Sequence, residues 1–353
     1  GITRPITKHN YLVKDVKDLA RTIKEAFHIA STGKPGPVLI DIPSDVQLAE
    51  TEFHYPHEVN IRGYKPTYCG HTGQIKRAAK MISESRRQVI YAGGGCRLSG
   101  TSKELREFPG QINPPVTMTL LGLRVFPADH ELSLGMLGMH GTGYANHAVQ
   151  NCDLLIAAGA RFDDRVTGKI DEFAPHAKII HIDIDPSAIS KSVRADLPIV
   201  GDVKCILGEL LKIVHRPHDK EWTQKIVEWK EKHPLSYKQD DKLRPQYVIE
   251  QICEATKGDA IIATDVGQHQ MWTSQRYKFT RPRELLSSGG LGTMGYGFPA
   301  GMGAKVGKPD SQVFVISGDG SFQMNIQELS TAVVNKIDVK IAILNNSCLG
   351  MVR

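Results

Sequence analysis

Two apolar runs separated by one helix-like segment, near the end of this 353-residue chain, constrain its fold more than any other feature. The first run, Val313–Ile316, is followed by a Gly-Asp-Gly turn centred on Asp319, and the second, Val339–Leu344, is followed by an Asn-Asn pair that ends at Asn346. Two hydrophobic runs that flank one helix are typical of a β-α-β unit. Its crossover is right-handed and its strands are parallel, so both strands end at the same edge of the sheet. The sequence therefore predicts that Asp319 and Asn346 lie side by side.

The segment between the two runs carries the signals of a helix start. Asn325, with Glu328 three residues later, is typical of a capping box. Ile326, Leu329 and Val333 recur at helical spacing and predict the buried stripe that packs on the sheet. We therefore expect one helix that begins just past the Gly-Asp-Gly turn.

The paired strand ends suit a hard divalent cation that also holds a phosphate. Magnesium prefers near-octahedral oxygen coordination at roughly 2.0–2.1 Å, and one or two protein oxygens usually suffice. Asp319 offers a carboxylate, Asn346 an amide oxygen, and Cys348 a backbone carbonyl. Gly318 and Gly320 let the backbone approach a diphosphate, and the helix N-terminus behind them favours negative charge. A lone polar residue at a strand end is ordinary loop chemistry, but two on adjacent strands favour a magnesium site.

Three further stretches are more specific than this motif. They read VGQHQMW at Val266–Trp272, SGGLGTMGYG at Ser288–Gly297 and GDGSFQMNIQE at Gly318–Glu328. Together with Gly-Asp-Gly and Asn-Asn, which resemble the thiamine-diphosphate motif, they are similar to the catalytic large subunits of the acetohydroxyacid synthase (acetolactate synthase) family. The resemblance extends along essentially the whole chain. It implies decarboxylation of pyruvate and carboligation to a second 2-keto acid, pyruvate or 2-ketobutyrate, in valine, leucine and isoleucine biosynthesis.

The resemblance also assigns cofactors and their residues. Around thiamine diphosphate it places Val266, Gly267, Gln268, His269, Gly292, Met294, Gly320 and Ser321, with Met294 supporting the bent cofactor. Around FAD, which takes no redox part in the family's main reaction, it places Gly93, Thr119, Leu120, Met139, His140, Gly141, Gly159, Arg161, Asp163, Arg165, Val166, Asp183, Ile184, Asp202 and Val203. Mg²⁺ is implied at Asp319, Asn346 and the Cys348 carbonyl. The family's catalytic Glu has no match here, because Glu25 lies on an amphipathic helix where we expect a solvated surface role.

Alternating periodicities predict an α/β fold of tandem, doubly wound, Rossmann-like parallel sheets, the type that the resemblance also implies. The expected domains are the end of a pyrimidine-binding domain at 1–47, a linker at 48–70, a central FAD-binding domain at 71–210, a connector at 211–243 and a truncated diphosphate-binding domain at 244–353. In the first of these, we expect a strand at Val38–Ile42 and an amphipathic helix with Leu19, Ile23, Ala26, Phe27 and Ala30 on one face. Later we expect a helix at 72–84 and strands at Val89–Ala92, Val116–Thr119, Asp153–Ala158, Ile179–Ile184, Leu197–Val200, Ala260–Thr264 and near Leu285–Ser288.

Some residues support a second interpretation. Gly290, Gly292 and Gly295 satisfy the G-x-G-x-x-G pattern of a dinucleotide-binding loop, with Asp319 as the ribose-binding acid. That alternative predicts nothing special at Asn346, which the magnesium site requires, so thiamine diphosphate is favoured. Two alternatives for the whole protein are a pyruvate oxidase or another carboligase that uses its flavin, and a nucleotide-binding module without catalysis.

Local patterns elsewhere are less decisive. The cluster from Arg161 to Arg165, with Asp163 and Asp164 between, suits phosphate binding at a strand end or an ordinary surface ion-pair network, and the residues alone leave both open. His269, taken by itself, is most simply a surface residue at a helix end.

Composition sets the remaining bounds. The net charge of +6 is spread along the chain, which argues against nucleic acid, and no stretch approaches the ~20 apolar residues of a membrane helix. The six cysteines lack metal-ligand spacing, and no signal-like start is present, so a reducing, cytoplasmic location is expected.

Both ends read as cut, so we expect no activity from the chain alone. The resemblance implies 2-keto acids as small-molecule partners, a homodimer or dimer of dimers, and a regulatory small subunit.

Overall fold

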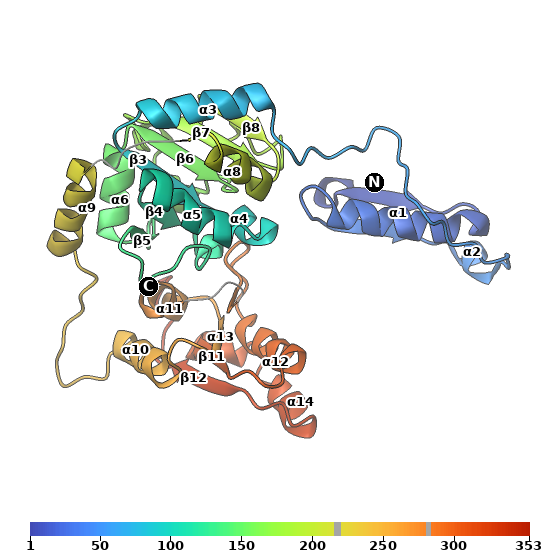
Figure 1. Cartoon of the computed structure of the whole chain (residues 1–353). Helices are drawn as coiled ribbons and strands as arrows, with labels where there is room; N and C mark the ends of the chain where they lie inside the picture. Colours follow the sequence, from blue (N-terminus) through green and yellow to red (C-terminus); the bar gives the residue numbers. More distant parts are fainter. Residues whose placement is uncertain (215–219, 280–283) are drawn as a thin grey trace.

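The computed structural model describes residues 1–214, 220–279 and 284–353. Three sheets follow one another along the chain, with two, six and four strands (Figure 1). Every strand pairing among the described residues is parallel. The predicted α/β class with tandem parallel sheets is therefore confirmed. No helix in the described part of the chain is long and apolar enough to cross a bilayer.

The six-stranded sheet has the strand order of a doubly wound fold. Its strands are β3 (Gln88–Ala92), β4 (Val116–Met118), β5 (Ser133–Met136), β6 (Leu154–Ala158), β7 (Lys178–Asp183) and β8 (Leu197–Val200), in the order β5-β4-β3-β6-β7-β8. The chain thus winds outward in both directions from the β3–β6 pair, the arrangement that opens a ligand crevice at the reversal point. Five of these strands match the predicted ones. We did not predict β5, a short strand that contains Gly135 at a positive φ of 67° and pairs with β4 through a register shift.

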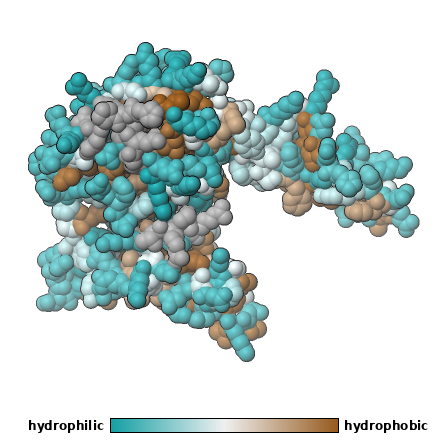
Figure 2. Space-filling view, in the orientation of Figure 1, coloured by the Kyte–Doolittle hydropathy of each residue, from teal (hydrophilic) through white to brown (hydrophobic). Residues whose placement is uncertain are grey.

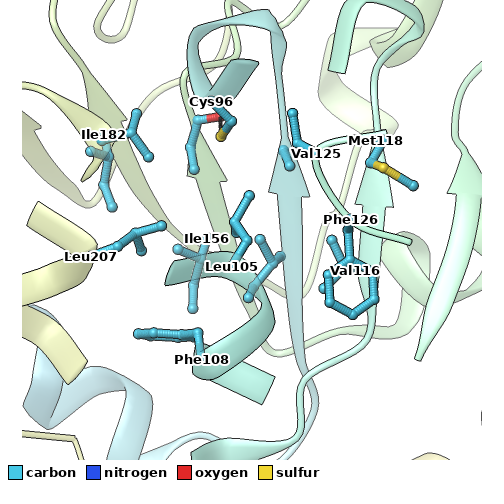
Figure 3. Packing of buried hydrophobic residues seen from close by; sticks show 14 of the residues in the cluster. Cys96, Leu105, Phe108, Val116, Met118, Val125, Phe126, Ile156, Ile182 and Leu207 are labelled. Carbon is cyan, nitrogen blue, oxygen red and sulfur yellow. Dashed lines mark hydrogen bonds between the residues drawn. The ribbon is translucent and has the colours of Figure 1, made fainter. Parts of the chain in front are cut away.

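Helices cover both faces of this sheet. They are α3 (Thr72–Glu84), α4 (Gly94–Ser99), α5 (Ser102–Ile112), α6 (Gly143–Asn151), the short α7 (Asp164–Thr167), α8 (Val203–Leu211) and α9 (Lys220–Lys232), with 3₁₀ turns η3 (Leu120–Gly122) and η4 (Ile170–Glu172). Figure 3 shows Leu105 and Phe108 of α5 and Leu207 of α8 packed against Ile156 and Ile182 of the sheet. Alternate strand residues belong to a second core cluster, which includes α6 and α9. Successive side chains along each strand point to opposite faces of the sheet, so each face packs into its own hydrophobic layer.

The helix α9 lies in the predicted connector but belongs to the second core cluster. Trp222 and Ile226 are buried there, and the indole Nε1 of Trp222 donates to the Gln88 carbonyl at 3.1 Å. Most charged residues of α9 are exposed, whereas Lys230 donates to the Glu131 carbonyl at 2.6 Å. A helix that looks solvated by composition thus helps to close the central sheet.

The four-stranded sheet contains the β-α-β unit predicted at Val313–Leu344. Its elements are α10 (Pro245–Ala255), β9 (Ile261–Thr264), α11 (Gln268–Arg276), β10 (Leu285–Ser287), α12 (Gly297–Gly307), β11 (Val313–Gly318), α13 (Asp319–Gln323), α14 (Glu328–Val334) and β12 (Lys340–Leu344), with strand order β10-β9-β11-β12. Gly318 is in register with Leu344 across the parallel β11–β12 pair. The residues that follow these two strands therefore emerge at one edge.

The helix between β11 and β12 differs from the prediction. It is split into α13 and α14, and the capping box is wrong, because Gln327 precedes α14 without a side-chain cap. The Nδ2 of Asn325 instead donates to the Gly295 carbonyl at 2.6 Å, and its Oδ1, the atom that a cap would use, accepts from Gln327 Nε2 at 3.2 Å.

The predicted buried stripe of this helix is also wrong. The exposed fractions of Ile326, Leu329 and Val333 are 47, 38 and 76%, and Ala332 is buried instead. Figure 2 shows the corresponding apolar surface at the end of the molecule where Figure 1 places α14. Helical spacing identified an apolar face, but not whether the sheet reaches it.

The first unit holds η1 (Arg4–Ile6), β1 (His9–Leu12), η2 (Val16–Asp18), α1 (Leu19–Ser31), β2 (Val38–Asp41) and α2 (Ser44–Leu48), and Figure 1 shows it to one side of the other two sheets. We did not predict β1, which pairs in parallel with β2. On the amphipathic helix α1, Thr22, Ala26 and Ile29 are buried, whereas Phe27 is 72% exposed.

Glu25 is not the solvated residue that we expected. Its side chain is only 15% exposed. Its carboxylate accepts a hydrogen bond from the Tyr11 hydroxyl at 3.1 Å. Burial and this carboxylate raise the pKa of Tyr11 to about 12. Glu25 therefore ties α1 to β1.

The central and third sheets share one hydrophobic core. The first core cluster runs from Val125 and Phe126 to Leu285 and Ile316 of the third sheet. Across the same contact, the amide of Gln275 donates to the His140 carbonyl at 2.8 Å. These contacts hold the two sheets together as one packed body.

Candidate functional site

The carboxyl ends of the third sheet border a cavity of about 250 Å³. Every residue that the sequence analysis assigned to thiamine diphosphate or magnesium lines it: Val266, Gly267, Gln268, His269, Gly292, Met294, Asp319, Gly320, Ser321, Asn346 and Cys348. The cavity is also lined by Gln270, Trp272, Gly318, Leu344 and the segment Leu349–Val352, which were not predicted as cofactor-binding residues. The only signal for that segment is its position immediately after Asn346.

The two oxygen ligands proposed for magnesium are adjacent, as predicted. The backbone N–H of Asn346 donates to Asp319 Oδ1 at 3.4 Å. The Asn346 side chain is oriented by two bonds: its Oδ1 accepts from the Cys348 N–H at 3.1 Å, and its Nδ2 donates to Gln268 Oε1 at 3.3 Å. Both side-chain oxygens keep a lone pair for a cation, and magnesium needs few protein ligands. The donor set therefore fits a hard cation such as Mg²⁺.

Glycines make the room beside these oxygens. A Cβ at Gly320 would lie 2.8 Å from Leu349 Cδ2 and 3.9 Å from Met294 Cε. At Gly267, where φ is +156°, a Cβ would lie 2.7 Å from His269 Cε1, and at Gly318 it would lie 3.0 Å from His269 Nδ1. A side chain at Gly267 or Gly318 would crowd the buried His269 ring, and one at Gly320 would require the Leu349 side chain to move.

His269 is buried within this wall, contrary to the surface position that its local sequence suggests. Its Nε2 has no hydrogen-bond partner among the described residues. Burial lowers the pKa of His269, although Asp265 and Asp319 oppose the shift. A neutral imidazole with one unused nitrogen is a group that a bound ligand can satisfy.

This burial predicts a pH dependence of stability. Because the folded pKa of His269 lies below its usual value of about 6.5, the unfolded state takes up the proton first as the pH falls below that value, and stability decreases. We expect the loss in unfolding free energy between about pH 7.5 and about pH 5.5 to be roughly 1 kcal/mol smaller in His269→Gln than in the wild type. Urea denaturation measures it.

Replacement of the exposed His176 by Gln is the matched control and should retain the wild-type pH dependence. Equal pH dependence in wild type and His269→Gln would contradict the buried, neutral state of His269.

Asp265 is a functional-site residue that the sequence analysis did not single out. It is 1% exposed, and its carboxylate accepts N–H groups from Val266, Gly295 and Gly297 at 2.8, 2.9 and 2.8 Å. These bonds fix the loop that carries Gly292 and Met294 to the end of β9. The available signal was an acid directly after a buried strand, where a carboxylate can organise a turn.

The residues assigned to FAD lie along the carboxyl edge of the central sheet. Gly93 follows β3, Thr119 follows β4, Gly159 follows β6 and Asp202 precedes α8. The Thr119 N–H donates to the Ala92 carbonyl at 3.0 Å. The Met139 N–H donates to the Arg165 carbonyl at 2.8 Å, which brings these two assigned segments together. Leu120, His140, Gly141, Val166, Ile184 and Val203 occupy the same connecting loops or helix starts.

Asp183 and the arginine cluster supply the charges of this edge. Burial raises the pKa of Asp183, whose Oδ1 accepts the Asp185 N–H at 2.9 Å. Arg161 pairs with Asp163, so the ion-pair interpretation of the cluster describes part of it. Arg165 is exposed; its guanidinium lies 4.0 Å from the Met139 sulfur and interacts electrostatically with Asp163 and His140. Because the side chain is exposed, its charge can also reach an anionic ligand.

Comparisons with known proteins agree with this arrangement. Residues 75–210 match the family described as "Thiamine pyrophosphate enzyme, central domain", and residues 265–353 match "Thiamine pyrophosphate enzyme, C-terminal TPP binding domain". These matches favour thiamine diphosphate over the dinucleotide alternative at Gly290–Gly295.

Individual relatives align along the whole chain. The acetolactate synthase large subunit of Buchnera aphidicola is 48% identical over 360 residues, and the acetolactate synthase isozyme 3 large subunit of Escherichia coli is 46% identical over 363 residues. Acetolactate synthase 1, chloroplastic, of Nicotiana tabacum is 49% identical over 360 residues. The chain spans 63, 63 and 54% of the lengths of these proteins. On these matches, the chain belongs to the thiamine pyrophosphate enzyme family, as a homologue of acetolactate synthase large subunits.

Proposed function

We propose that the protein containing this chain is a thiamine-diphosphate-dependent acetolactate synthase. It would decarboxylate pyruvate and join the remaining two-carbon unit to a second 2-keto acid, pyruvate or 2-ketobutyrate, for branched-chain amino acid synthesis. The observation that carries the proposal is the cavity at which Asp319, Asn346 and the glycines around them meet the loop of Met294. When bound, thiamine diphosphate supplies the electron sink for loss of carbon dioxide from a 2-keto acid.

The residues of this chain bind and orient the cofactor. Asp319, Asn346 and the Cys348 carbonyl would hold Mg²⁺, which offsets the diphosphate charge. The N-terminus of α11, which begins at Gln268, also faces the cavity and favours negative charge. Met294, fixed through the loop that Asp265 holds, would support the bent conformation of the cofactor. These roles affect binding more than they affect the chemical step.

We further propose FAD at the edge of the central sheet. The supporting observations are the doubly wound strand order, the glycine after β3 and the exposed cation of Arg165. Asp183, at the end of β7, can accept ribose hydroxyls there. The proposed division into domains is 1–47, 48–70, 71–210, 211–243 and 244–353, of which residues 215–219 and 280–283 lie outside the described part.

We also propose partners and a location. Two of the relatives are named large subunits, which supports pairing with a smaller regulatory subunit. Exposed apolar side chains such as Val333 and Val334 of α14 support self-association as a homodimer or dimer of dimers. The cysteines are free thiols, which supports a reducing compartment such as the cytoplasm.

The direct test is turnover by the full-length protein with pyruvate, thiamine diphosphate and Mg²⁺. We expect acetolactate to accumulate while non-covalently bound FAD keeps its oxidised absorption spectrum. Rapid-scan absorbance, together with a colorimetric acetolactate assay, measures both in one sample, and protein stripped of Mg²⁺ is the control.

Two other outcomes would contradict the proposal. Flavin bleaching at the rate of product formation, with peroxide as a product, would identify an oxidase. Tight nucleotide binding without thiamine diphosphate affinity would identify a nucleotide-binding module.

A further inference from the structure

Two cysteines far apart in sequence meet at the point where the linker reaches the central sheet. Cys69 lies in the segment that leads into α3, and Cys205 lies in the first turn of α8. The Cys205 thiol donates to Cys69 Sγ at a sulfur–sulfur distance of 3.0 Å, across 136 residues of sequence. We propose that Cys69 and Cys205 form a reversible disulfide that fastens the linker to α8 under oxidising conditions.

The backbone around both residues is already fixed in a geometry that brings the thiols together. The Asp202 N–H donates to the Tyr68 carbonyl at 2.8 Å, so the linker is bonded to the start of α8 one residue before Cys69. A Cβ at Gly70 would lie 2.7 Å from Ile199 Cγ2, which shows how closely the linker packs on this part of the sheet. A disulfide needs its sulfur atoms about 2.0 Å apart. Small side-chain rotations therefore suffice to close the remaining distance.

The two thiols differ in the way that a two-step exchange requires. Cys69 is exposed and open to an oxidant in solution, whereas Cys205 is partly buried. The hydrogen bond to Cys69, followed by burial, raises the pKa of Cys205 to about 11. Cys69 is accordingly the attacking thiol and Cys205 the resolving one.

The reaction balances with a small-molecule disulfide, RSSR, as the oxidant. The Cys69 thiolate attacks one sulfur of RSSR, breaks its S–S bond and releases RS⁻. Cys205 loses its proton and attacks Cys69 Sγ in the mixed disulfide, which releases the second RS⁻. Two thiols are oxidised, RSSR is reduced to two RSH, and both protons are taken up by the leaving thiolates.

The other cysteines and a metal are weaker explanations of this geometry. Cys96 and Cys152 are buried, and their S–H groups donate to backbone carbonyls. No group of three or more His, Cys, Asp or Glu that could hold a metal occurs in the described ranges, so the pair lacks the third ligand of a zinc site.

The test treats the full-length protein with oxidised glutathione and maps tryptic peptides without reduction. We expect a disulfide-linked pair of peptides, 63–76 with 205–212, and a loss of two titratable thiols per chain that dithiothreitol reverses. In Cys205→Ser, Cys69 should instead retain a mixed disulfide with glutathione. In Cys69→Ser, no cross-link should form.

Cys253→Ser is the matched control, since this thiol is also partly buried, and it should cross-link as the wild type does. Oxidised wild type should also unfold a few degrees higher than reduced protein, because the cross-link restrains the unfolded chain. A stable mixed disulfide at Cys69 in the wild type, a cross-link only between separate chains, or unreacted Cys69 would each overturn the proposal.

Discussion

Replacing Asp319 with alanine in the full-length protein is expected to abolish retention of Mg²⁺ and thiamine diphosphate. The change removes one of two side-chain oxygens at the proposed metal site and leaves the diphosphate charge uncompensated. Loss of a residue that only hydrogen-bonds to a metal ligand typically lowers metal affinity by about 10–100-fold. Loss of a ligand itself should therefore lower the affinity for thiamine diphosphate by more than about 100-fold. Isothermal titration calorimetry in the presence of Mg²⁺ measures the effect.

Asp310→Ala is the matched control for this experiment. Asp310 is an exposed carboxylate that precedes β11, whereas Asp319 follows it, so the two lie at opposite ends of the same strand. The control should bind the cofactor normally, and both variants should keep the wild-type melting temperature within a few degrees. Unchanged affinity in Asp319→Ala would remove the metal assignment.

Gly93→Ala is expected to destabilise the central sheet strongly. A Cβ at Gly93 would lie 2.1 Å from the Gly159 carbonyl oxygen and 2.7 Å from Ala160 Cα, which are backbone atoms that cannot rotate away. The φ of Gly93 is −102°, so the obstacle is this close approach and not an unusual backbone conformation. Overpacking a core costs typically 1–3 kcal/mol, and a clash between two backbones should cost at least about 3 kcal/mol.

Gly208→Ala, in the same domain, is expected to leave the stability unchanged or to raise it. No heavy atom lies within 4 Å of the Cβ that this change would add. Gly208 lies inside α8, where alanine is favoured over glycine by roughly 0.5–1 kcal/mol. Urea denaturation followed by circular dichroism should show the Gly93 variant unfolding at lower urea and the Gly208 variant at equal or higher urea than the wild type. A Gly93 variant as stable as the wild type would contradict the close β3–β6 contact.

Much of the candidate site could be predicted because parallel strands impose a simple rule. Once the runs ending near Asp319 and Asn346 were recognised as neighbouring strands, their adjacency followed from the parallel register. Residues distant in sequence, such as Gln268 and Met294, reached the same cavity wall because each follows a strand of that sheet or lies in the loop after one.

Predictions from local sequence patterns were wrong where the same side chains make tertiary contacts. Asn325 has the sequence of a helix cap, but its Nδ2 donates to the Gly295 carbonyl and its Oδ1 accepts from Gln327. His269 has the sequence of an exposed helix end, but the approach of Gly267 and Gly318 buries it. In both cases a residue far away in the sequence, Gly295 or Gly318, makes the contact, and the residues adjacent in sequence do not predict it.

The sequence by itself determined the α/β class, the parallel sheets and the motif that brings Asp319 to Asn346, because hydrophobic period and turn chemistry act over a few residues. Only the tertiary structure decided which apolar faces are covered, how α9 closes the central sheet, and that Cys69 meets Cys205. These features depend on elements that are far apart along the chain. Their contacts form only when whole sheets and helices pack, so no local pattern records them.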